Sequence, residues 1–106
     1  MMSDIDYVVL LCEQIAICGN IKYKRFEDRY LIFCNDKEIF TIIGYKILVK
    51  NNEFTRNNFN NLHLESLKQY EEYFLIEDAH NKKLLCYITK RFLNDNNSRK
   101  QNILNF

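Results

Sequence analysis

The sequence has no proline and only two glycines, Gly19 and Gly44, which stand far apart in the chain. Loops that cradle nucleotide phosphates need several glycines close together, because only a bare backbone lets N–H groups approach the phosphate oxygens. The sequence therefore excludes the P-loop and the dinucleotide-binding fingerprint. We expect a protein without a cofactor.

No stretch of the sequence stays apolar for the ~20 residues that a membrane-spanning helix requires. The apolar run 8–12 is short and is flanked by Asp4, Asp6 and Glu13. A secretory signal would instead carry positive charge ahead of an unbroken apolar segment. We therefore expect a cytoplasmic protein that does not associate with a membrane.

The sequence also lacks the closely spaced ligand pairs of metal sites, such as two cysteines separated by two residues. Each cysteine lies in an apolar run, where a reduced thiol packs as a small hydrophobic side chain. We predict reduced thiols and no metal site. The cysteines and histidines concerned are Cys12, Cys18, Cys34, Cys86, His63 and His80.

No set of catalytic groups stands out in the sequence. Cys18 is the most exposable thiol, but it lies at the end of a predicted helix, where the negative end of the helix dipole raises a thiol pKa. Neighbouring carboxylates diverge on a strand and on a helix, so they do not form ready acid–base pairs. We therefore predict that the protein is not an enzyme. The carboxylate pairs are Glu27-Asp28, Glu71-Glu72 and Glu77-Asp78.

What the chain has is a supply of apolar and aromatic side chains. Of its 106 residues 47% are apolar, with eight Phe and seven Tyr, which suits one modest core. We predict a single domain over residues 1–93, followed by a polar and basic tail over 94–106 that we expect to be mobile. Fourteen asparagines, with many Lys and Ile, are typical of A/T-rich genomes such as those of some bacteria and their phages.

The first half of the chain predicts a helix followed by strands. Ser3 can cap the helix together with Asp6, apolar residues recur at helical spacing up to Ala16, and Gly19 suits a left-handed C-terminal cap. Residues 21–26 alternate, and 29–34 and 38–43 flank a short polar turn, as in a hairpin. Gly44 interrupts the continuation 45–50, which leaves open one long kinked strand or two strands.

The second half predicts a loop, a helix and a further strand. Residues 51–61 are polar and rich in asparagine, as in a loop. Asn60 or Asn61 can cap a second helix with apolar residues on one side, although 73–76 would equally suit a strand. Residues 84–89 read as a strand. The chain is therefore predicted to be an α+β fold with an N-terminal helix, an antiparallel sheet of about four to five strands and a second helix on one face. The apolar side of the second helix would carry Leu64, Leu67, Tyr70 and Phe74.

Charge is unevenly distributed, although the net charge is only +1. Residues 65–78 hold five acidic and one basic residue (net −4), and residues 82–100 hold six basic and one acidic residue (net +5). We predict a protein-binding module, of the kind that phage or mobile-element accessory and inhibitor proteins represent, whose acidic stretch occupies a basic groove in a host nucleic-acid-handling complex. The two charged halves can also meet each other, either within one molecule or across a homodimer. The predicted partner-binding residues are Glu65, Glu71, Glu72, Glu77, Asp78 and Phe106.

An alternative hypothesis is a small protein that binds single-stranded nucleic acid. Basic and aromatic residues interleave in two segments that read as strands, and strand-borne aromatics beside cations can stack bases and neutralise phosphates. The low net charge and the absence of the glycine-containing RNA-recognition signature count against it. The residues of this alternative are Lys22, Tyr23, Lys24, Arg25, Tyr87, Lys90 and Arg91.

Overall fold

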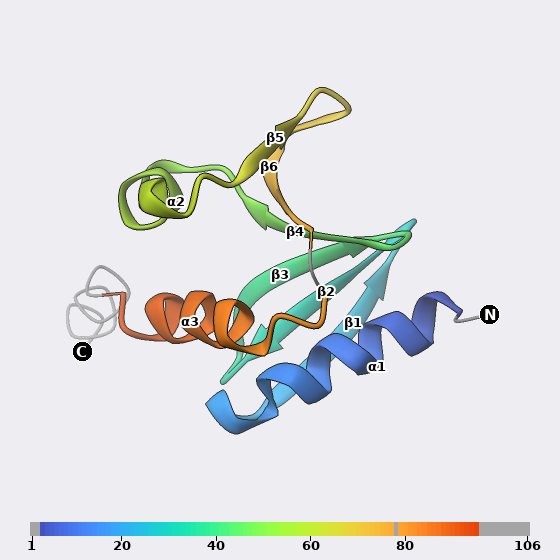
Figure 1. The fold of residues 1–106 in the computed structure, drawn as a ribbon. Helices are drawn as coiled ribbons and strands as arrows, with labels where there is room; N and C mark the ends of the chain where they lie inside the picture. The colour runs from blue at the N-terminus through green and yellow to red at the C-terminus, as the bar shows by residue number, and fades with distance from the viewer. Residues whose placement is uncertain (1–2, 78, 96–106) are drawn as a thin grey trace, which may run out of the picture.

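The computed structural model describes residues 3–77 and 79–95, and these form an α+β fold with one six-stranded antiparallel sheet (Figure 1). The strand order is β1-β2-β3-β4-β6-β5. The predicted class is confirmed, with slightly more strands than expected. The elements are α1 (Asp4–Ile15), η1 (Ala16–Cys18), β1 (Ile21–Phe26), β2 (Arg29–Cys34), β3 (Lys37–Ile43), β4 (Lys46–Lys50), α2 (Glu53–Asn58), η2 (Asn60–Leu62), β5 (Glu65–Leu67), β6 (Tyr70–Ile76) and α3 (Lys82–Leu93).

Helix α1 begins at the predicted cap. Asp6 N–H donates to Ser3 Oγ at 3.3 Å, and Ser3 N–H donates to the Asp6 carboxylate at 3.1 Å. The left-handed cap at Gly19 was wrong, because the helix passes into η1 and Gly19 has an extended backbone. Gly19 serves a close approach instead, since a Cβ there would lie 2.6 Å from Asn35 Oδ1. That oxygen accepts the Asn20 N–H at 2.8 Å.

Two-residue turns set the register of β1 to β4. Asn35 and Asp36 both have positive φ, 52° and 66°, as a type I′ turn between β2 and β3 requires. Gly44, with φ of 59°, turns the chain between β3 and β4, so the segment after it is a separate strand. β3 lies between two strands and is buried on both faces from Ile39 to Ile43.

Three predictions for the second half of the chain were wrong. The expected loop 51–61 contains α2, the expected helix after Asn61 is the β5–β6 hairpin, and the expected strand 84–89 lies within α3. In β6, neighbouring residues such as Tyr73 and Phe74 pack into two different clusters on opposite faces of the sheet. A segment that is apolar on both faces carries no period that separates a strand from a helix.

Helix α3 was missed because its apolar run is continuous from Leu84 to Cys86. The helical signal lies in the wider window, where Leu85, Ile88 and Phe92 are buried at the spacing of one helix face. Asn81 supplies the cap, since its Oδ1 accepts the Leu84 N–H at 3.1 Å. The helical spacing of the buried residues and the Asn81 cap together favour a helix, although residues 84–86 alone resemble a strand.

The main core lies between one face of the sheet and the helices. α3 packs against α1 and β3, and buried side chains of both helices join those of β2 to β4 and β6. Figure 1 shows α1 and α3 side by side over β1–β3, with the β5–β6 hairpin turned away from them. On the other face of the sheet a smaller cluster gathers around Ile43, Leu48 and Tyr73. There Arg29 Nη1 donates to Tyr73 Oη at 3.3 Å.

Helix α2 is short and depends on its cap. Asn52 Oδ1 accepts the Thr55 N–H at 3.0 Å, and Thr55 Oγ1 accepts the Asn52 N–H at 2.9 Å. The Thr55 hydroxyl also donates to Lys50 O at 2.6 Å, which ties the helix to the end of β4. These hydrogen bonds fix the start of α2 relative to β4.

We expect Asn52→Ala to lower the free energy of unfolding by about 1 kcal/mol, because it removes an N-cap acceptor. Asn57→Ala is the matched control, since it makes the same change at an exposed position inside the same helix. Alanine is the better helix former there, so that variant should be neutral or slightly more stable. Urea denaturation measures both, and equal stabilities of the two variants would contradict the role of the cap.

Candidate binding surface

Helix α3 presents two chemically different faces. Leu85, Ile88 and Phe92 point into the core, while Lys83, Tyr87 and Lys90 are exposed on the opposite side. The core residues repeat at the helical period, so residues on the opposite side of the helix, such as these three, face outward. A basic and partly aromatic surface results from the burial of the apolar face.

This outer face borders a groove of about 610 Å³. Ile17 of η1 forms the other wall and is 76% exposed, the highest value among the exposed large hydrophobic side chains. Within the described residues, none of the groove's lysines forms a salt bridge. The groove is lined by Ile17, Lys82, Lys83, Cys86, Tyr87 and Lys90.

Two thiols, Cys18 and Cys86, lie beside the groove. Burial, followed by an interaction with the Cys86 thiol, raises the pKa of Cys18 to about 11, although the nearby Lys90 ammonium lowers it. The Cys86 thiol donates to Gln14 O at 3.3 Å. Burial raises the pKa of Cys12 and of Cys34 as well. His63 lines two hollows to which no cysteine contributes.

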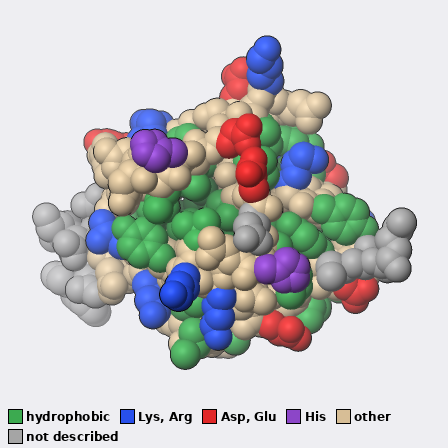
Figure 2. Space-filling model, in the orientation of Figure 1, with side chains coloured by type: hydrophobic (Ala, Val, Ile, Leu, Met, Phe, Trp, Pro, Cys, Tyr) green, Lys and Arg blue, Asp and Glu red, His purple; other side chains and the backbone are tan. Residues whose placement is uncertain are grey.

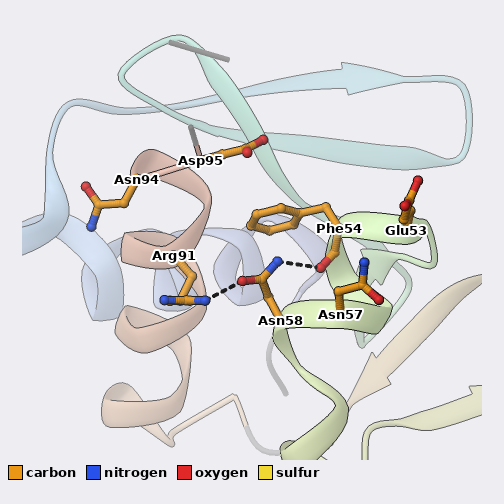
Figure 3. A pocket seen from close by; sticks show the side chains of 7 residues that line it. All are labelled: Glu53, Phe54, Asn57, Asn58, Arg91, Asn94 and Asp95. Atoms are coloured by element: carbon orange, nitrogen blue, oxygen red, sulfur yellow. Dashed lines mark hydrogen bonds between the residues drawn. The ribbon is translucent and has the colours of Figure 1, made fainter. Parts of the chain in front are cut away.

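The two neighbouring cations Lys90 and Arg91 point to different sides of α3. Arg91 lines a separate polar hollow of about 380 Å³ between α2 and α3 (Figure 3). Its guanidinium donates to Asn58 Oδ1, and Asn58 Nδ2 donates to Phe54 O at 2.8 Å. Arg91 is therefore engaged in holding α2 against α3, whereas Lys90 belongs to the groove.

The acidic residues predicted to bind a partner fall into two groups. Glu65 and Glu77 meet at the open end of the β5–β6 hairpin, where Glu77 raises the pKa of Glu65 through hydrogen bonding first and charge repulsion second. Glu71 and Glu72 lie nearer the turn of the hairpin. Asp78, Phe106 and most of the predicted tail lie outside the described residues.

Glu65 and Glu77 line a hollow of about 410 Å³ that is otherwise mostly apolar. Four leucines and one isoleucine contribute to its walls, together with His63, whose φ of 53° marks the bend before β5. The remaining lining residues are Leu62, Leu64, Leu75, Ile76 and Leu84.

The basic and aromatic residues of β1 are divided between the two faces of the sheet. Tyr23 and Arg25 share a face with Tyr30, where the rings of Tyr23 and Tyr30 are 6.1 Å apart and the Arg25 guanidinium lies 5.8 Å from the Tyr30 ring. Lys22 and Lys24 point to the other face, since side chains alternate along a strand. Lys22 pairs with an aspartate in the β2–β3 turn at 3.4 Å.

The other residues of the nucleic-acid hypothesis, Tyr87, Lys90 and Arg91, lie on a helix and not on a strand. The structure therefore does not gather the two basic segments on one sheet surface. Sequence reasoning did not single out Ile17, Lys82 and Lys83 as candidate site residues. The amphipathic pattern of 82–93 could have revealed the two lysines, whereas nothing local distinguishes the exposed Ile17 from the buried Ile15.

No protein-family model matches this sequence, and no curated protein is significantly similar to it. Within the described residues, no helix has both the length and the apolar character needed to cross a membrane. No group of three or more His, Cys, Asp or Glu in residues 3–77 and 79–95 has the arrangement of a metal site.

We expect Cys18 to react slowly with iodoacetamide in the folded protein. A pKa raised from 9.0 to about 11 lowers the thiolate fraction at neutral pH about 100-fold, and the thiolate is the reactive form. Mass spectrometry of labelled peptides gives the rate for each cysteine, and the same chain in urea is the control. The native rate should keep rising with pH up to about 11. Labelling of native Cys18 at the rate of the unfolded chain would contradict the assignment.

Proposed function

We propose that this chain is a non-enzymatic protein-binding module and that the groove between Ile17 and the outer face of α3 is its recognition surface. The observation that carries the proposal is the combination of an exposed aliphatic side chain, Ile17, with three lysines that have no salt-bridge partner in the described residues. Exposed apolar surface rimmed by polar residues is typical of interaction sites.

The chemistry of the groove indicates its partner. Ile17 and Tyr87 offer apolar area, whose burial supplies roughly 25 cal/mol per Å². Lys82, Lys83 and Lys90 add little affinity as exposed charges, but they steer an anionic partner and discriminate against basic ones. The groove therefore suits a protein segment that carries both apolar and acidic side chains.

A binding role also agrees with the state of the thiols. The raised pKa of Cys18 leaves that thiol without the thiolate character that a nucleophile needs, and the Cys86 thiol donates a hydrogen bond to the backbone. The groove therefore supports recognition better than covalent chemistry.

Binding of single-stranded nucleic acid is the second candidate, and one arrangement favours it. Tyr23, Tyr30 and Arg25 form an aromatic and cationic group at the sheet edge that β1 provides, and Tyr23 is 48% exposed. Bases can stack on such a group. Protein binding in the groove is preferred over nucleic-acid binding, because the exposed Ile17 side chain can contact an apolar side chain of a protein but contributes nothing to the binding of phosphates.

Affinity capture with matched charge variants tests the proposed function. We expect the variant K83E/K90E to recover at least about tenfold less of the partner than the unsubstituted protein, which corresponds to about 1.4 kcal/mol. The control K46E/K68E changes the net charge equally at two exposed lysines outside the groove. It should recover the partner normally.

Quantitative mass spectrometry of the captured material gives the amount of partner that each form recovers. A protein recovered equally by the unsubstituted chain, K83E/K90E and K46E/K68E, or no recovered protein, would count against the groove.

Fluorescence anisotropy with an oligothymidylate probe tests the second candidate, the binding of single-stranded nucleic acid. Salt-sensitive binding that Tyr23→Ala and Arg25→Ala abolish, combined with an unproductive capture, would replace the proposed function by nucleic-acid binding.

A further inference from the structure

Two patches of opposite charge lie on the same face of the molecule. Figure 2 shows acidic side chains near the end of β6 and basic side chains along α3, with hydrophobic surface between them. The basic patch is the groove of Lys82, Lys83 and Lys90. The acidic patch is the hollow that contains Glu65 and Glu77.

The two patches are close in the chain but separated by the helix. Glu77 immediately precedes the turn into α3, and Leu84 of the first turns of α3 lines the acidic hollow. Lys82 and Lys83 begin the same helix and line the groove on its other side. The helix thus lies between them, and neither patch neutralises the other within one molecule.

Both patches lack counter-charges within the described part of the chain. No salt bridge involves Glu65, Glu77 or the groove lysines. Glu65 and Glu77 lie close enough that Glu77 raises the pKa of Glu65, through hydrogen bonding first and charge repulsion second. A cation beside Glu65 and Glu77 would reduce the repulsion between the two carboxylates. A carboxylate in the groove would likewise reduce the repulsion among the lysines.

We propose that two copies of this chain form a two-fold dimer in which the acidic hollow of each copy receives the lysine groove of the other. In a two-fold dimer, the acidic patch of the first copy contacts the basic patch of the second copy. By symmetry, the basic patch of the first copy contacts the acidic patch of the second. The charge contacts are therefore formed in two equivalent sets, and like charges are kept apart.

The apolar parts of the two patches also match. Leu62, Leu64 and Leu84 line the acidic hollow, and Ile17 and Tyr87 line the groove. Contact between the patches buries aliphatic and aromatic surface on both copies, which supplies affinity that exposed ion pairs alone do not. The charges then set the orientation of the two copies.

This inference rests on the groove that the proposed function assigns as a recognition surface. The second copy occupies that groove in the free protein, so a partner protein has to displace it. Self-association thereby controls access to the groove. The acidic hollow of the second copy and the partner protein compete for the same groove.

Sedimentation velocity over micromolar to millimolar concentrations tests the dimer. We expect the unsubstituted chain to shift from monomer to dimer as its concentration rises, and added salt to weaken the association. E65K/E77K and K83E/K90E should each remain monomeric, because each variant makes both patches carry the same charge. The control K46E/K68E should dimerise as the unsubstituted chain does.

An equimolar mixture of E65K/E77K and K83E/K90E provides the decisive measurement. Every patch of one variant is then complementary to the facing patch of the other, so the mixture should form a heterodimer although neither variant associates alone. Differently tagged copies identify the heterodimer by co-purification. An unsubstituted chain that stays monomeric at millimolar concentration, or a mixture that forms no heterodimer, would overturn the proposed dimer.

The same variants separate this inference from the proposed function. E65K/E77K leaves the groove intact, so it should capture the partner at least as well as the unsubstituted chain while failing to dimerise. Dimerisation without any captured partner would overturn the proposed function alone. Capture of the partner by a chain that never dimerises would overturn the dimer alone.

Discussion

The burial of one face of α3 is the constraint on which the rest of the surface depends. Leu85 and Ile88 are fully buried, and Phe92 packs against Phe54 and Phe59 of the α2 region. Because these side chains fix the rotation of the helix, Lys83, Tyr87 and Lys90 have to face outward. The groove is therefore a direct consequence of core packing.

The same helix also divides the charges of the molecule. Arg91 is directed to α2 and holds it through Asn58, while Lys90, one residue earlier, faces the groove. Adjacent residues on a helix are rotated by about 100° from each other, so two cations that look equivalent in the sequence have different roles. The acidic pair Glu65 and Glu77 is assembled by the β5–β6 hairpin from positions twelve residues apart.

The first half of the fold could be predicted because its signals are local. The Ser3 and Asp6 cap, the Asn35-Asp36 turn and the alternation of β1 each act within a few residues. The second half could not, because the apolar runs at 73–76 and 84–86 suit a strand and a helix equally. Tertiary packing decides between them: β6 pairs with β4 and β5, and α3 completes the cover over the sheet.

Composition and short-range hydrogen bonding were enough to predict the α+β class, the N-terminal helix, the hairpin of residues 29–43 and the uneven distribution of charge. Which charged residues lie together, in contrast, depends on the tertiary structure. The fold engages Arg91 with Asn58, brings Glu65 beside Glu77, and places Ile17 next to the lysines of α3. The physical reason is that a surface is assembled from residues distant in the chain, and their meeting depends on how the core orients each element.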